Sequence, residues 1–108
     1  MINTENRDHF QDLISSESPV CALFTADWCP DCVVIKPVMP ELEQEYSGRY
    51  RFVSVDRDAH LDLCRELNVF GIPSFIVFRG GRETARFVST ERKTRDQIEE
   101  FLNRAETL

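Results

Sequence analysis

The stretch W-C-P-D-C, from Trp28 to Cys32, places two thiols three positions apart in the chain. An apolar run at 20–26 precedes the stretch and has the composition of a buried strand, while the residues after it, through Tyr46, show helical periodicity. The pair Cys29 and Cys32 therefore lies at a predicted junction between a strand and a helix. A C-x-x-C pair at such a junction is typical of thiol redox chemistry.

The geometry of a helix start explains why this spacing suits redox chemistry. With Cys29 at the helix N-cap and Cys32 at the third helical position, the two side chains lie on one face, close enough to form a disulfide. The free N–H groups and the positive end of the helix dipole favour a thiolate on Cys29 by roughly 0.3–2 kcal/mol. The sequence thus predicts Cys29 as the nucleophile and Cys32 as the resolving thiol, because exchange proceeds through a thiolate.

Length and composition indicate one globular domain spanning residues 1–108. The chain has 42% hydrophobic and 30% charged residues, and its 108 residues suffice for one packed core. Its formal net charge of −6 argues against nucleic acid or an anionic membrane as the main partner. No apolar run is long enough to span a bilayer, and residues 1–6 form neither a basic nor an apolar targeting segment. We therefore expect a cytoplasmic protein that is a monomer.

Periodicity and turn residues predict alternating strands and helices. The predicted helices cover 5–15, the long segment from the C-x-x-C motif to Tyr46, 59–67 and 94–104, and the predicted strands cover 20–26, 51–55, 74–78 and 83–88. Pro37 and Pro40 are expected to kink the long helix without ending it, because apolar residues keep helical spacing across both prolines. Gly80-Gly81 marks a hairpin turn between the last two strands. This order predicts an α/β fold with a mixed β-sheet.

Several motifs match one known family in order and spacing. They are the strand leading into 26–32, the helix proline Pro37, the strand end Val55-Asp56, and Gly71-Ile72-Pro73 ahead of the strand 74–78 and the Gly80-Gly81 turn. On these motifs the chain resembles the thioredoxin family, and in particular its subgroup with the W-C-P-D-C signature. The resemblance implies a thioredoxin-like fold, in which a central mixed β-sheet is flanked by helices, and a protein-disulfide reductase that works by dithiol-disulfide exchange.

The resemblance also implies how the site is assembled and supplied with electrons. It implies a cis peptide bond at Pro73 beside the cysteine pair, with the backbone of Ile72 pairing with an extended substrate segment. It implies that Trp28 walls the active site, although ordinary core packing is the alternative for this ring. A redox-active disulfide between Cys29 and Cys32 then needs no bound cofactor or metal, and its electrons come from NADPH through a separate thioredoxin-reductase-like flavoprotein. The expected substrates are disulfide-containing proteins.

Two departures from the family pattern concern charge at the active site. Thioredoxins usually have W-C-G-P-C, whereas here Pro30 precedes the acidic Asp31. A carboxylate about 7 Å from Cys29 opposes its thiolate by roughly 0.6–2.4 kcal/mol, although Asp31 also suits the first turn of a helix. The family commonly pairs a buried aspartate with a lysine under the resolving cysteine, and Leu23 and Phe52 occupy those positions here. Deprotonation of the resolving cysteine must then use water or another group.

A third departure lies after the hairpin, where the family usually has a glycine. This chain has Val88-Ser89 there, followed by an apparent insertion of mixed charge at 90–93. We expect this loop to border the substrate site, with Ser89 among the residues that contact substrate. The loop is therefore expected to restrict broad access for protein substrates.

The two remaining cysteines need separate explanations. Cys21 lies inside the first predicted strand, where a small buried hydrophobe is expected. Cys64 lies on the predicted helix at 59–67, where it is either packed or has a second redox role.

Three rival hypotheses remain open at this point. A structural zinc site would use four residues of the kinds that zinc takes, namely Cys29, Cys32, His60 and Cys64. The altered motif also fits a reductase of mixed disulfides between proteins and a small cellular thiol. The third hypothesis is a redox sensor or binding module without turnover, because the catalytic apparatus is weakened at Asp31 and under the resolving cysteine.

Overall fold

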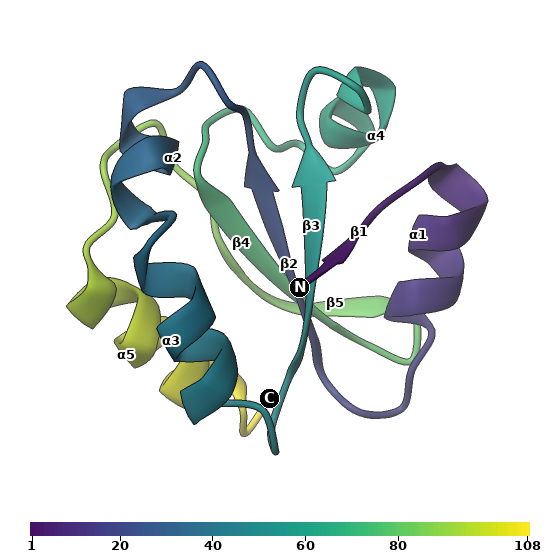
Figure 1. Cartoon of the computed structure of the whole chain (residues 1–108). Coiled ribbons are helices and arrows are strands. Elements are labelled where there is room, and N and C mark those ends of the chain that lie inside the picture. Colours follow the sequence, from purple (N-terminus) through teal and green to yellow (C-terminus); the bar gives the residue numbers. More distant parts are fainter.

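A five-stranded mixed sheet forms the centre of the computed structural model, which describes residues 1–108 (Figure 1). Its strands are β1 (Ile2–Asn3), β2 (Val20–Thr25), β3 (Arg51–Asp56), β4 (Ser74–Arg79) and β5 (Arg82–Phe87). Their order across the sheet is β1-β3-β2-β4-β5. Strands β1, β3 and β2 run parallel, whereas β4 is antiparallel to β2 and to β5. The prediction of an α/β fold with a mixed sheet is confirmed.

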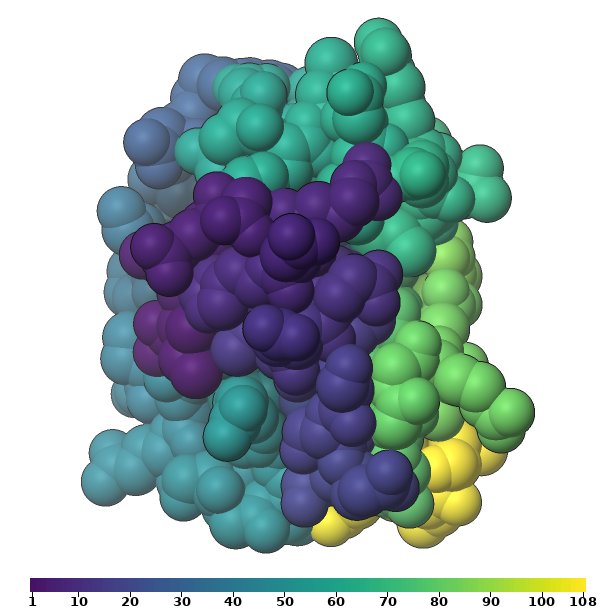
Figure 2. Space-filling view, turned by 90° about the vertical axis from the view of Figure 1, so that its right-hand side faces the viewer, coloured from purple at the N-terminus to yellow at the C-terminus, as the bar shows by residue number.

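Five helices cover the two faces of the sheet. They are α1 (Arg7–Ile14), α2 (Pro30–Ile35), α3 (Val38–Glu45), α4 (Leu61–Glu66) and α5 (Arg95–Ala105). Helices α1 and α4 lie on one side of the sheet, and α2, α3 and α5 lie on the other (Figure 1). Figure 2 shows the purple N-terminal segment with α1, and the adjoining teal segment, covering the first of these sides. None of the helices combines the length and the apolar composition needed to cross a membrane.

Strand β2 is buried on both faces and separates two hydrophobic clusters. Cys21 and Leu23 belong to the cluster that includes residues of α3 and α5. Val20, Ala22 and Phe24 belong to the cluster that includes residues of α1 and α4. Successive side chains of a strand point to opposite faces, so an unbroken apolar run is what a central strand requires. Strand β2 therefore anchors the segment that follows it, which carries the cysteine pair.

The structure has two helices where the sequence predicts one kinked helix. Helix α2 stops before Lys36, and α3 begins at Val38 with Pro37 at its N-cap. Pro37 has no N–H to donate to the carbonyl four residues back, so the first helix does not continue through it. The N–H of Lys36 instead bonds the carbonyl of Val33 at 3.3 Å, in a tighter turn. Pro40 lies in the first turn of α3, where its missing N–H breaks no helical hydrogen bond.

Strand β1 is absent from the sequence-based prediction. Its two residues are exposed and too few to show periodicity. The strand forms because Ile2 and Asn3 pair in parallel with Val53 and Ser54 of β3. Only the folded sheet supplies these partners. The bounds of the remaining elements lie within two residues of the predicted ones.

Burial of the Cys21 thiol is expected to lower the free energy of unfolding at alkaline pH. The thiol is fully buried on β2, and burial raises its pKa well above the ordinary value of about 8.5. The folded state thus favours the protonated thiol, so its contribution to stability is complete below about pH 8.5 and is lost as the pH rises further. We expect Cys21→Val to lose less stability than the unmodified protein between about pH 8 and about pH 10.5, as measured by thermal unfolding. Equal losses in the two proteins would contradict this assignment.

Candidate active site

The cysteine pair lies where β2 passes into α2, at one edge of the sheet (Figure 1). Cys29 is the N-cap of α2, and its sulfur accepts the N–H of Cys32 at 3.3 Å. Pro30 occupies the first helical position, where its missing N–H breaks no hydrogen bond. Cys32 is the third helical residue, so both predicted positions are confirmed. The N–H of Cys32, one of the groups that the helix start leaves without a backbone partner, therefore points to the sulfur of Cys29.

The two thiols differ in their surroundings. The Cys29 thiol donates to the carbonyl oxygen of Ile72, with the sulfur 3.8 Å from that oxygen. Cys32 is 4% exposed, and burial raises its pKa, with the neighbouring Cys29 acting in the same direction. The Thr25 hydroxyl and the Ala26 backbone lower that pKa by hydrogen bonding, but more weakly than burial raises it. Cys32 therefore holds its proton more tightly than an exposed cysteine does.

The loop before β4 reaches the cysteine pair from a distant part of the chain. The peptide bond between Ile72 and Pro73 is cis, which confirms that expectation. Ile72 packs against a small cluster formed by Ala26, Cys29 and Cys32. The backbone of Ile72 therefore lies beside the sulfur of Cys29.

Gly71 and Ser89 hold this loop against the segment that follows β5. A Cβ on Gly71 would lie 2.1 Å from the carbonyl oxygen of Ser89, so only glycine permits this approach. Ser89 accordingly lies next to the cis-proline loop.

Trp28 lies on the surface and not in the core. The residue is 59% exposed, and its Nε1 donates to Asp58 Oδ2 at 2.7 Å. The guanidinium of Arg57 lies 5.7 Å from the ring centroid. Asp58 is itself placed by the turn after β3, where its N–H bonds the Asp56 carboxylate at 2.9 Å. The alternative of core packing for Trp28 is therefore wrong. The sequence gives no signal for the role of Asp58, because its partner Trp28 lies 30 positions away.

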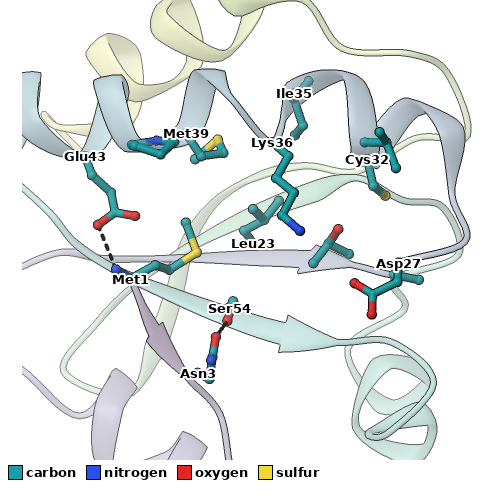
Figure 3. Close-up of a pocket in the computed structure, with 14 residues that line it drawn as sticks. Met1, Asn3, Leu23, Asp27, Cys32, Ile35, Lys36, Met39, Glu43 and Ser54 are labelled. Atoms are coloured by element: carbon teal, nitrogen blue, oxygen red, sulfur yellow. Dashed lines mark hydrogen bonds and ion pairs between the residues drawn. The ribbon is translucent and has the colours of Figure 1, made fainter.

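A cavity of about 590 Å³ lies between α2, α3 and strands β1 to β3, with Cys32 near one end (Figure 3). Leu23, which occupies the position of the family's buried aspartate, is one of its lining residues. The charged side chains of Asp27 and Lys36 point into the same cavity (Figure 3). Cys32 thus shares one cavity with two charged side chains, Asp27 and Lys36.

The segment after β5 brings two cations to the site that the sequence analysis did not assign there. Arg92 Nε lies 3.0 Å from Asp31 Oδ1. Lys93 is 1% exposed, and burial lowers its pKa, while Asp31 and the two cysteines act in the opposite direction. The expectation that Asp31 acts on Cys29 as a lone opposing charge is therefore incomplete. The mixed charge of the insertion at 90–93 was the only signal of these contacts in the sequence.

The four residues of the zinc hypothesis do not come together. Cys64 is buried in the hydrophobic cluster of α1 and α4, apart from the cluster that holds Cys29 and Cys32. His60 Nε2 lies 3.1 Å from the backbone oxygen of Thr4. No group of three or more His, Cys, Asp or Glu residues has positions that suit a metal ion. The hypothesis of a zinc site built from these residues is therefore wrong.

In comparison with known proteins, a family model described as Thioredoxin matches residues 1–104, which is almost the whole chain. The chain belongs to the thioredoxin family. It is 36% identical over 95 residues to thioredoxin X, chloroplastic, from Arabidopsis thaliana, covering 84% of this chain and 52% of that protein. It is 34% identical over 88 residues to thioredoxin C-2 from Corynebacterium nephridii, covering 82% of each chain.

Two further comparisons concern a larger relative and the fold. The bifunctional thioredoxin reductase/thioredoxin of Mycobacterium leprae is 33% identical over 92 residues, which are 85% of this chain and 20% of that protein. The chain thus spans about half of the chloroplast relative and a fifth of the mycobacterial one. Thioredoxin from Trypanosoma brucei brucei has a crystal structure with a TM-score of 0.87 at 21% identity, covering 100% of this chain and 92% of that one. This likeness confirms the thioredoxin fold.

Family membership and the positioned dithiol together define the chemistry of this thioredoxin-family protein. Its C-x-x-C dithiol, Cys29 and Cys32, is that of a thiol-disulfide oxidoreductase. Exchange between thiols and disulfides needs no bound cofactor, because the electrons are carried by the cysteine pair itself.

Replacing Gly71 by alanine should disrupt the cis-proline loop. The new Cβ would lie 2.1 Å from the Ser89 carbonyl oxygen and 2.8 Å from the Thr90 nitrogen, both of them backbone atoms. We expect Gly71→Ala to lower the free energy of unfolding by about 1–3 kcal/mol, the usual cost of overpacking, and to reduce turnover. Gly48→Ala is the matched control, because nothing lies within 4 Å of a Cβ at Gly48. Urea unfolding measures both variants, and equal stability would show that the contact of Gly71 with Ser89 does not hold the site together.

Proposed function

We propose that the protein reduces disulfides in other proteins, with Cys29 as the attacking thiolate and Cys32 as the resolving thiol. The observation that carries this assignment is the position of Cys29 at the N-cap of α2, where its sulfur accepts the N–H of Cys32. A helix N-terminus favours negative charge, whereas burial keeps the proton on Cys32. Pro30 and Asp31 support the helix start, the first by its fixed φ and the second by its charge in the first turn.

The proposed exchange takes two steps and conserves electrons. The Cys29 thiolate attacks one sulfur of the substrate disulfide, forms a mixed disulfide, and releases the other substrate sulfur as a thiolate that takes a proton from solvent. Cys32 then loses its proton and attacks the sulfur of Cys29. A disulfide between Cys29 and Cys32 forms, and the second substrate sulfur leaves as a thiolate. The substrate gains two electrons and the protein loses two.

Three segments around Cys29 position the substrate in this proposal. Trp28 walls one side, and the backbone of Ile72 next to Pro73 pairs with an extended segment of the substrate. Ser89 borders the site where the loop after β5 meets the cis-proline loop.

Exposed apolar side chains support a protein as the substrate. Trp28, Val33 and Phe70 are each more than half exposed, and all three lie in or next to the segments that form the site. Large apolar residues on a surface mark places where another protein is bound.

We infer that the protein is a single-domain, monomeric cytoplasmic carrier of electrons in cell redox homeostasis. Its disulfide is reduced by a separate flavoprotein of the thioredoxin reductase type, which draws on NADPH. The name of the Mycobacterium leprae relative, in which thioredoxin and thioredoxin reductase share one chain, supports such a partner. The formal net charge of −6 is unsuited to nucleic acid or an anionic membrane as a partner.

A second candidate substrate is a mixed disulfide between a protein and a small acidic thiol. The observation that favours it is Arg92, whose side chain is 66% exposed and lies beside Asp31 at the rim of the site. A guanidinium in this position can bind a carboxylate of the small thiol. The exchange steps are unchanged.

The decisive experiment measures NADPH oxidation with a thioredoxin reductase, this protein and insulin as the disulfide substrate. We expect turnover by the unmodified protein and none by Cys29→Ser, because the attacking thiolate is lost. Cys32→Ser should accumulate a mixed disulfide with the substrate, visible by mass spectrometry, because the resolving thiol is lost.

Cys64→Ala is the control for thiol number, since Cys64 is buried in a different cluster, and it should keep turnover. A second arm replaces insulin by a protein carrying a mixed disulfide with a small acidic thiol. Turnover in that arm alone would favour the second candidate substrate. Absence of turnover in both arms, with Cys29 still readily alkylated, would overturn the proposal in favour of a sensor without turnover.

A further inference from the structure

Lys93 is a buried cation with no role in the exchange steps described above. Lysine is almost never fully buried unless it is paired, yet this residue is only 1% exposed. Its Nζ donates to the carbonyl and hydroxyl oxygens of Ser89, both at 3.0 Å, and to the carbonyl oxygen of Glu91 at 2.8 Å. These acceptors are neutral, so the charge of Lys93 is solvated by its own loop without being cancelled.

The loop that carries Lys93 contacts two segments next to the cysteine pair. At one end the carbonyl of Ser89 packs against Gly71, next to the cis-proline loop. Near the other end Arg92 binds Asp31, in the first turn of α2, at 3.0 Å. The centroid of the Phe87 ring lies 5.4 Å from the Lys93 ammonium. The ammonium is thus inside the protein, on a loop whose Arg92 contacts the first turn of α2.

The charged and titratable groups around this ammonium are those of the active site. Arg92, the neighbour of Lys93, pairs with Asp31 in the first turn of α2, and the charges of Asp31, Cys32, Glu91 and Cys29 raise the pKa of Lys93 against the lowering by burial. A charge acts more strongly in the protein interior than in water, where it is screened. The exposed Arg92, whose side chain is 66% exposed, is therefore a weaker source of potential at the sulfurs than Lys93.

We propose that Lys93 is a positioning residue of the dithiol, whose buried charge stabilises the thiolate of the pair and offsets the opposing carboxylate of Asp31. In this role Lys93 brings a charge to the site from the loop after β5. The sheet brings none, because Leu23 and Phe52 are apolar. The inference rests on the proposed function only in taking Cys29 as the attacking thiolate.

The test compares rates of Cys29 alkylation by iodoacetamide in Cys32→Ser proteins, so that a single active-site thiol reacts. Lys93→Gln keeps an N–H donor for the loop but removes the charge, and we expect the rate at about pH 7 to fall roughly threefold to tenfold. The whole pH profile of alkylation should move to higher pH. Asp31→Asn should act in the opposite direction, and Lys93→Arg should restore the rate because it keeps the charge.

Arg79→Gln is the matched control, because it removes one positive charge at the far end of β4 and should leave the profile unchanged. Circular dichroism of each variant separates a charge effect from loss of structure. An unchanged pH profile in folded Lys93→Gln would overturn the proposal and reduce Lys93 to a support of its loop.

A second measurement needs no variant of Lys93. The chain has two lysines, Lys36 and Lys93, so labelling lysine Cε with carbon-13 gives two signals in NMR spectra. We expect the Lys93 signal, assigned as the one that remains in Lys36→Arg, to change position as Cys29 ionises, and this change to vanish in Cys29→Ser. A Lys93 signal whose chemical shift does not change as Cys29 ionises would overturn the proposal. Neither the alkylation nor the NMR experiment requires turnover. Failure of insulin reduction would therefore not contradict the role of Lys93. An unchanged alkylation profile in Lys93→Gln would likewise not contradict the proposed reductase activity.

Discussion

Burial of β2 on both faces is the constraint on which the rest of this structure depends. Its alternating side chains enter two separate hydrophobic clusters, so the strand cannot shift along its axis without placing every residue on the wrong face. The chain leaves the end of β2 and begins α2 within a few residues, with Cys29 as the N-cap. The position of Cys29 at the start of α2 therefore follows from the burial of the strand before it.

The charge at this site lies outside the sheet. Leu23 and Phe52 belong to the hydrophobic cluster shared with α3 and α5, so the sheet under Cys32 is apolar. Charged groups instead approach from the cavity, through Asp27 and Lys36, and from the loop after β5. A buried carboxylate without its cation would be costly, and replacing both partners by apolar residues avoids that cost. The site thus differs from the usual family arrangement without leaving a buried charge unpaired in the sheet.

Local sequence patterns correctly predicted those features that depend only on residues close together in the chain. The N-cap position of Cys29 was predictable because capping involves only the next few residues. The break at Pro37 was not, because helical spacing of apolar residues continued past it and suggested one helix. The hydrogen bond from Trp28 to Asp58 also escaped prediction, since it joins residues from two different loops.

By itself the sequence determined the order of strands and helices, the placement of the dithiol at a strand-helix junction and the apolar replacement of the buried relay. These features depend on periodicity, on capping and on residue type at single positions. Only the tertiary structure decided that Ile72 lies on the cysteine pair, that Gly71 packs against Ser89, and that a lysine is buried beside the site. Each of these contacts joins segments far apart in the chain. Their distances are set by how the whole sheet and its helices pack, which no local pattern encodes.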